Sequence, residues 1–286
     1  MKTVNTNPPQ LPRLLALFSA SVGRLILVPV SRPNHETSNP LRPPMPRQRS
    51  LGLVSSLLFL ALSSFLCSHS LLAAPAYVQS AYADPQTSQT TVSVTYSVAQ
   101  GAGDLNVVVV GWNDTTDTVS SVTDSQNNTY QLAVGPTKES SSLTQSIYYA
   151  TNIVGGSNTV TITFSGAAAY PDIRILEYSG LNLSSPLDVA AGASGTGTSS
   201  SSGAITTTSA SDLLVGANIV TSTTKSAGSG YTKRILTSPD GDIVEDRTVS
   251  STGSYTATAT ISSGGWVMQV VAFRAAGQAT PTPTPT

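Results

Sequence analysis

The stretch Leu105–Trp112, with the sequence LNVVVVGW, constrains the fold most strongly. Four consecutive valines are too β-branched for a helix, and the run is too short for a buried helix, so it predicts a strand. Both faces of this strand are apolar, so we expect it to lie centrally in a sheet packed against other layers. The stretches Leu213–Val220 and Trp266–Phe273 have the same character. These three segments are expected to hold the core.

From Ala76 onward the pattern is that of an all-β chain, with strict alternation in Thr90–Ser97 and no useful helical periodicity. We expect eleven to thirteen strands. Two pairs of neighbouring strands are predicted to form hairpins, one around residues 125–128 and one around Gly155-Gly156, because Asn and Gly tolerate the backbone that such turns need. The predicted fold class is a two-sheet antiparallel β-sandwich of jelly-roll or concanavalin-like character.

The run Gly192–Gly203 is almost entirely Gly, Ser and Thr. It is predicted to be a mobile surface loop inside one domain rather than a linker between two. A strand, a turn and an apolar strand occur at Thr90–Trp112 and again at Ile205–Val220, with Gly103-Asp104-Leu105 matching Ser211-Asp212-Leu213. The simpler interpretation is that the same strand–turn–strand arrangement occurs twice in a sandwich, and the alternative is a true internal duplication.

Charge is distributed unevenly along the 286 residues. Residues 1–76 contain seven of the 14 basic residues and one of the 15 acidic residues, so the remainder has seven basic and 14 acidic residues. An acidic domain argues against binding to nucleic acid or to anionic membrane surfaces, because both require clustered Lys and Arg.

The single cysteine, Cys67, and both histidines, His35 and His69, lie upstream of residue 76. The chain beyond them therefore lacks the residues for a Ser-His-Asp triad, a thiol nucleophile, a histidine-bound zinc or a disulfide.

The sequence predicts four regions. Residues 1–44 are expected to be disordered or to come from an over-extended translation start. Residues 45–76 resemble a signal peptide, with two arginines, an apolar run at Leu51–Leu66 and small residues in Ala74-Pro75-Ala76; a retained anchor is the alternative. Residues 77–275 form the β-sandwich, and residues 276–286 form a Pro/Thr linker or stalk. The expected location is extracellular or on the cell surface, with no membrane attachment after cleavage.

Several strings together resemble a recurrent module of secreted bacterial proteins associated with concanavalin-like or jelly-roll sandwiches: VSSVTDSQNNTY, IYYATNI, ILEYSG and WVMQVVAFR. The resemblance covers about residues 76–275. It implies a fold rather than an activity, and no catalytic residue is carried over from it.

One acidic cluster could hold Ca²⁺, because hard cations take several oxygen ligands and a Gly-containing loop lets them converge. Its members lie in the segment SPDGDIVED and are Asp240, Asp242, Glu245 and Asp246. The alternative is a turn at Asp240-Gly241 followed by a strand with a solvated acidic face. No other cofactor is predicted.

Sugar binding without catalysis needs exposed aromatic faces and hydrogen-bonding groups. The candidate ligand-binding residues are Tyr170, Tyr149, Trp112 and Asp114. Tyr148 and Tyr149 must face opposite sides of a strand, and Trp112 could instead belong to the core. Glycoside hydrolysis needs two carboxyl groups at the scissile bond, and the ExDxE triplet of laminarinase-type enzymes is missing. The lone strand acid Glu177 is expected to pair with Arg174 or with a neighbouring strand.

The sequence therefore favours a secreted, non-catalytic binding or adhesion module for extracellular carbohydrate, with a polysaccharide or cell-surface component as partner. A structural component of the cell surface or matrix is the alternative, and a secreted glycoside hydrolase is a third hypothesis.

Overall fold

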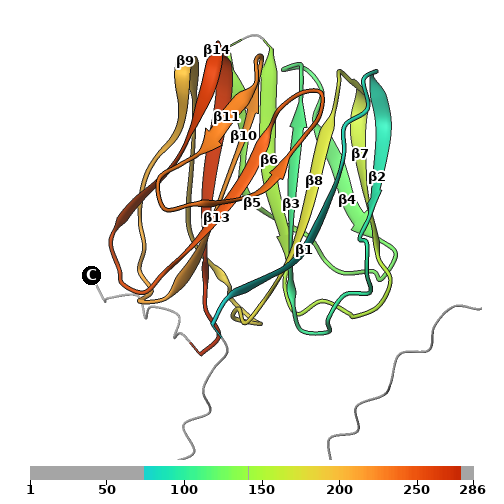
Figure 1. Ribbon diagram of the computed structural model, residues 1–286. Helices are drawn as coiled ribbons and strands as arrows, with labels where there is room; N and C mark the ends of the chain where they lie inside the picture. Colours follow the sequence, from blue (N-terminus) through green and yellow to red (C-terminus); the bar gives the residue numbers. More distant parts are fainter. Residues whose placement is uncertain (1–73, 141, 278–286) are drawn as a thin grey trace, which may run out of the picture. The chain divides into compact units, whose positions relative to one another are not determined.

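The computed structural model describes residues 74–140 and 142–277. The predicted N-terminal region, signal peptide and Pro/Thr tail lie outside the described residues, except for positions 74–76 and 276–277. The described chain contains fourteen strands, all paired antiparallel, and no helix. The predicted all-β antiparallel sandwich is confirmed (Figure 1).

Hydrogen bonding divides the strands into three sheets. The five-stranded sheet has the order β1 (Ala76–Ala83), β8 (Asp172–Ser179), β3 (Leu105–Trp112), β6 (Leu143–Ala150) and β5 (Gln131–Glu139). The three-stranded sheet has the order β2 (Gln89–Thr95), β7 (Thr159–Ala168) and β4 (Val119–Asp124). The six-stranded sheet runs β11 (Thr224–Ala227), β14 (Ser254–Arg274), β10 (Asp212–Val220), β13 (Ile243–Val249) and β12 (Thr232–Leu236), with β9 (Leu187–Thr206) on β14.

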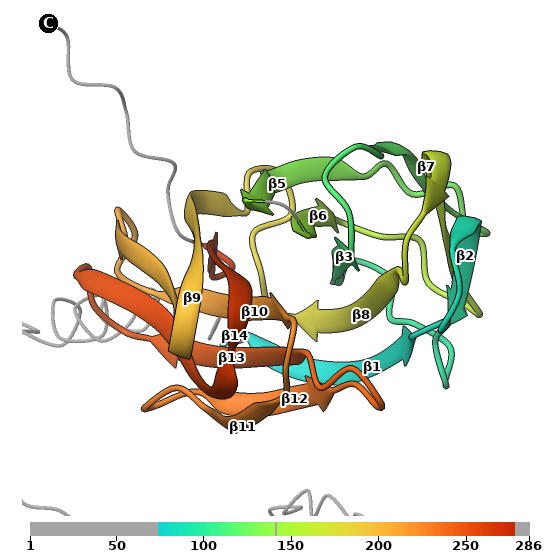
Figure 2. The ribbon, with the colours of Figure 1, turned by 90° about the horizontal axis from the view of Figure 1, so that it is seen from above.

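The five-stranded sheet is the middle layer, as Figure 2 shows. Its central strand β3 is buried along its whole length. Val107 and Val109 pack in one core cluster with β10, whereas Val108 and Val110 pack in another cluster with β7. The prediction that this strand is covered on both faces is confirmed, and β10 and the second half of β14 are buried in the same way.

The strand order shows an internal repeat. The five-stranded sheet β1-β8-β3-β6-β5 has the same order as the first half of β9, the second half of β14, β10, β13 and β12. The three-stranded sheet β2-β7-β4 likewise matches the second half of β9, the first half of β14, and β11. β9 corresponds to β1 and β2 of the first half, and β14 corresponds to β7 and β8. In each case one continuous strand stands where the first half of the chain has two. The match between Thr90–Trp112 and Ile205–Val220 is thus one part of a repeat that includes every strand. The interpretation that the same strand–turn–strand motif occurs twice independently covered only this part of it.

The run Gly192–Gly203 is not a loop, contrary to the sequence prediction, but lies within β9. Its backbone pairs with β14, from Gly192 opposite Gln269 to Ser199 opposite Thr260. Small side chains suit this strand because its neighbours are close: a Cβ on Gly195 would lie 2.7 Å from Cζ2 of Trp266. Pairing with β14 therefore overrides the loop-like composition.

Neither predicted hairpin forms. β4 pairs with β7 and β5 pairs with β6, so the turn after Asp124 connects two different sheets. The turn at Gly155-Gly156 likewise joins β6 of the five-stranded sheet to β7 of the three-stranded sheet. The left-handed backbone expected of the first turn is present at Asn127, with φ of 58°. Turn residues thus indicated where the chain reverses but not which strand each segment joins.

Candidate functional site

A hollow of about 150 Å³ lies between the three-stranded and five-stranded sheets. It combines aromatic, charged and hydroxyl side chains; its lining residues are Trp112, Asp117, Thr118, Val119, Pro136, Lys138, Ser146 and Tyr148. These residues come from β3, β5, β6, the first residue of β4 and the segment that leads into β4. The hollow thus brings two aromatic rings together with charged and hydroxyl side chains.

Strand register determines which β6 side chains reach the hollow. Ser146 lies opposite Val110 and Tyr148 lies opposite Val108, so both project toward the three-stranded sheet. Tyr149 points to the other face, where its ring lies 5.5 Å from that of Phe273. Tyr148, not the predicted Tyr149, therefore lines the hollow.

Trp112 forms the buried wall of the hollow. Its ring meets Phe164 edge-on, with centroids 5.6 Å apart and planes at 66°. Only 1 % of Trp112 is exposed, yet its indole Nε1 has no acceptor among the described residues. A buried N–H without an acceptor is unfavourable, and ordered water or a ligand oxygen commonly supplies one.

Two charged side chains stand in the wall and are held by neighbouring groups. Asp117 accepts a hydrogen bond from the Ser165 hydroxyl at 3.2 Å. Lys138 donates from Nζ to the carbonyl oxygen of Thr115 at 2.6 Å. These contacts place a carboxylate and an ammonium group in the lining beside the aromatic rings.

Asp114 holds two loops together. Its carboxylate accepts hydrogen bonds from the backbone N–H groups of Thr116, Asp117 and Ala169, at 2.9, 2.8 and 3.0 Å. Burial opposes ionisation of Asp114, but these hydrogen bonds outweigh it and lower its pKa. Ala169 precedes Tyr170, which is 47 % exposed and has a left-handed backbone with φ of 43°. The structure thus brings Trp112, Asp114 and Tyr170 to the same end of the sandwich and leaves Tyr149 apart.

The four carboxylates proposed for Ca²⁺ do not converge. Asp242 is buried and accepts the Val220 N–H at 2.8 Å, while Glu245 accepts the Gly228 N–H at 2.7 Å. Asp246 pairs with Arg234 at 2.7 Å, and the half-buried Asp240 contacts Gln86 at 3.2 Å. Within residues 74–140 and 142–277 we find no group of three His, Cys, Asp or Glu side chains that could hold a metal ion. Alternation along β13 sends Glu245 and Asp246 to opposite faces, which separates the predicted cluster.

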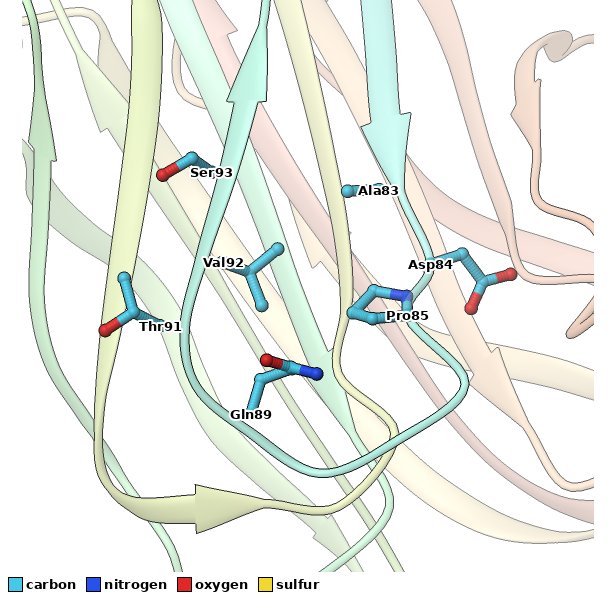
Figure 3. A pocket seen from close by; sticks show the side chains of 7 residues that line it. All are labelled: Ala83, Asp84, Pro85, Gln89, Thr91, Val92 and Ser93. Carbon is cyan, nitrogen blue, oxygen red and sulfur yellow. The ribbon is translucent and has the colours of Figure 1, made fainter.

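A larger but open groove of about 430 Å³ runs beside the connection between β1 and β2 (Figure 3). The Asp84 side chain points away from Thr91 and Ser93 in this view. Burial and the neighbouring Asp240 raise the pKa of Asp84 to about 7. Because its polar groups do not converge and no aromatic ring lines it, this groove is less suited to ligand recognition than the hollow at Trp112.

Comparisons of the chain with protein-family models, with curated proteins and with solved structures gave no match. Among the described residues there is also no helix of the length and apolar character needed to cross a membrane.

Proposed function

We propose that the protein is a secreted, non-catalytic module that binds extracellular carbohydrate, with the hollow at Trp112 as the subsite for one sugar ring. The observation that carries this proposal is the pair of aromatic walls, Trp112 and Tyr148, next to Asp117, Lys138 and Ser146. Sugars bind where apolar ring faces meet aromatic side chains and their hydroxyls meet fixed polar groups.

Size limits what the hollow can hold. Pockets for drug-sized ligands have volumes of roughly 300 Å³ or more, and this one has about 150 Å³. It therefore suits a single ring or a chain end, with the rest of the polymer outside. Tyr170, exposed on the loop that Asp114 ties to the β3–β4 connection, offers a second surface for stacking.

The carboxylates favour binding over hydrolysis. Asp117 is the one acid in the lining of the hollow, whereas glycoside hydrolysis uses two carboxyl groups on opposite sides of the bond. Binding is also expected to be independent of Ca²⁺, since no three acidic side chains of segment 240–246 come together within the described residues.

Co-sedimentation of the full-length chain with a panel of insoluble polysaccharides, in Ca²⁺ and then in EDTA, tests this function. We expect retention on at least one polymer in both buffers. Tyr148→Ala is expected to weaken retention about fivefold, because stacking contributes on the order of 1 kcal/mol. Tyr82→Ala is the matched control, since Tyr82 is 42 % exposed on β1 and lies outside the hollow.

Two results would count against the proposal. Equal retention of the Tyr148→Ala variant and the wild type would place sugar binding elsewhere on the molecule. Failure of the wild type to bind any polymer would favour the structural surface component instead. Thermal unfolding of each variant separates loss of the site from loss of the fold.

A further inference from the structure

β2 is an edge strand with one open side. Among the described strands its one hydrogen-bonded partner is β7. Just beyond the end of β2, the Tyr96 N–H donates to the carbonyl oxygen of Asn158 at 3.1 Å. Because the backbone groups of an antiparallel strand point alternately to its two sides, the two valines of β2 pair with β7 and the residues beside them direct their N–H and C=O groups the other way. The residues with free backbone groups are Thr91, Ser93 and Thr95.

The free side of β2 borders the open groove of about 430 Å³ shown in Figure 3. Thr91, Val92 and Ser93 form one wall of this groove, and residues 83–85 form the other. The side chain of Asp84, the charged residue of the lining, points away from β2. The connection from β1 therefore leaves the free backbone groups of β2 accessible.

Edge strands normally have features that prevent pairing with another chain, such as bulges, charged side chains or proline. The other edge strands in the described part of the chain have them, since bulges interrupt β1, β4, β5, β9, β11 and β12. Basic residues also occur in β5, β11 and β12, namely Lys138, Lys225, Lys233 and Arg234. In β2 the bulge lies before Thr91, and the run Thr91–Thr95 pairs regularly with β7 and contains no charged residue or proline.

The side chains of this run suit pairing with a second copy of the same strand. A twofold axis brings like residues together, so a charged strand would repel its own copy. If Ser93 lies opposite Ser93 of the second copy, Thr91 lies opposite Thr95, and exposed hydroxyls meet hydroxyls. The buried Val92 then lies opposite Val94, which continues the apolar inner face of the sheet. A partner of a different sequence would not require a strand without charges.

We infer that the free edge of β2 is a homodimer interface, in which the β2 strands of two copies pair antiparallel across a twofold axis. The two three-stranded sheets then form one continuous sheet. The hollow at Trp112 adjoins β4, at the opposite edge of the three-stranded sheet, so the inference does not depend on the proposed sugar binding. One pair of strands is a small interface, so we expect a weak, reversible dimer.

Light scattering of the full-length chain after size exclusion, over a series of micromolar concentrations, measures dimerisation. Ser93→Lys should weaken it about tenfold or more, because the pairing would place two ammonium groups side by side. Thr123→Lys is the matched control. Thr123 is exposed at the other edge of the same sheet, and both Ser93 and Thr123 lie beside Thr161 of β7. This variant should dimerise as the wild type does.

Hydrogen exchange of the wild type identifies the edge that is used. The amides of Val92 and Val94 are paired with β7 and should be protected at every concentration. The amides of Thr91, Ser93 and Thr95 should exchange fast in dilute solution and slow down as the dimer forms.

Two results of the first experiment would overturn the inference. One is a wild type that stays monomeric up to about 1 mM. The other is association that Ser93→Lys leaves intact, because the contact would then lie elsewhere on the chain. Fast exchange of the three free amides in a dimeric sample would also contradict it, and this measurement needs no variant.

Discussion

Nε of Arg174 lies 3.0 Å from Oδ1 of Asp172, and neither side chain of this ion pair is exposed to more than 1 %. The guanidinium also donates to the carbonyl oxygens of Asn218 and Ile243 and to Oε1 of Gln145, at 2.5, 3.1 and 3.0 Å. Arg174 thus connects the five-stranded sheet with β10 and β13 of the six-stranded sheet. The ion pair and these three hydrogen bonds offset the cost of burying the guanidinium group.

Replacement of this arginine should be among the most damaging single changes. Arg174→Met leaves a buried carboxylate and three acceptors without their donor, so we expect a loss of about 3–5 kcal/mol in the free energy of unfolding. Urea unfolding at pH 7 measures it. The half-exposed Arg234, which pairs with Asp246, is the matched position, and Arg234→Met should cost about 1 kcal/mol. Equal losses at the two positions would contradict the special role of the buried network.

Gly111 is required where the two large sheets meet. A Cβ at this position would lie 2.8 Å from Cδ1 of Ile219 and 3.2 Å from Nη2 of Arg174. Gly111→Ala is therefore expected to destabilise the domain by about 1–3 kcal/mol, although alanine is otherwise the better strand residue.

A second substitution tests that reason. Ile219→Val removes the methyl group that the new Cβ would meet and should cost about 0.5–1.5 kcal/mol alone. The double variant should then lose less than the two single losses added together, by on the order of 1 kcal/mol. Simple additivity in urea unfolding would show that the contact with Ile219 is not the cause.

The sequence predicted well what is encoded locally. The bounds of β3 were correct because four β-branched residues between two turns leave little alternative, whereas β10 begins at Asp212, one residue before the predicted start. The weakly patterned β1 was missed, since it becomes a strand only through its pairing with the distant β8. The error at Gly192–Gly203 has the same origin, because β14 supplies the partner that this run lacks on its own.

The candidate site was only partly predictable for a related reason. Alternation shows that Tyr148 and Tyr149 face opposite ways, but not which side is hollow. Asp117 and Lys138 carry no motif, and they meet Trp112 only because β3, β5 and the start of β4 come together in space. Alternation of side chains along strand residues 243–249 already indicates that Glu245 and Asp246 point to opposite faces and therefore cannot bind the same cation.

The turn after β4 is built around one carboxylate, Asp124. It accepts hydrogen bonds from the Asn128 N–H and Nδ2, from Nδ2 of Asn158 and from the Tyr130 hydroxyl, all at 2.8–2.9 Å. Burial opposes ionisation, but these bonds outweigh it and lower the pKa of Asp124. Asp124→Asn should cost about 2–3 kcal/mol at pH 7, because an amide cannot accept from all these donors.

The loss on Asp124→Asn should also depend on pH. A lowered folded-state pKa gives stability that is present above the unfolded pKa near 4 and is lost as the pH falls below it. Urea unfolding of the wild type and Asp124→Asn at pH 7 and pH 3 should show the difference shrinking at pH 3. A difference of the same size at both pH values would mean that the charge of Asp124 is not what stabilises the turn.

Hydrogen exchange can test whether the Gly/Ser/Thr run of β9 is a strand in solution. Its first half pairs with β14 on one side, so about every second amide between Gly192 and Gly197 should exchange slowly, whereas a loop would exchange throughout. Gly195→Ala should weaken this protection, because the new Cβ would lie 2.7 Å from Cζ2 of Trp266. Ser194→Ala is the control, since Ser194 is exposed and its neighbour Gly195 carries the contact. Rapid exchange of the whole run in the wild type would support the loop prediction. Equal protection in Gly195→Ala and Ser194→Ala would show that the contact with Trp266 does not require glycine at position 195.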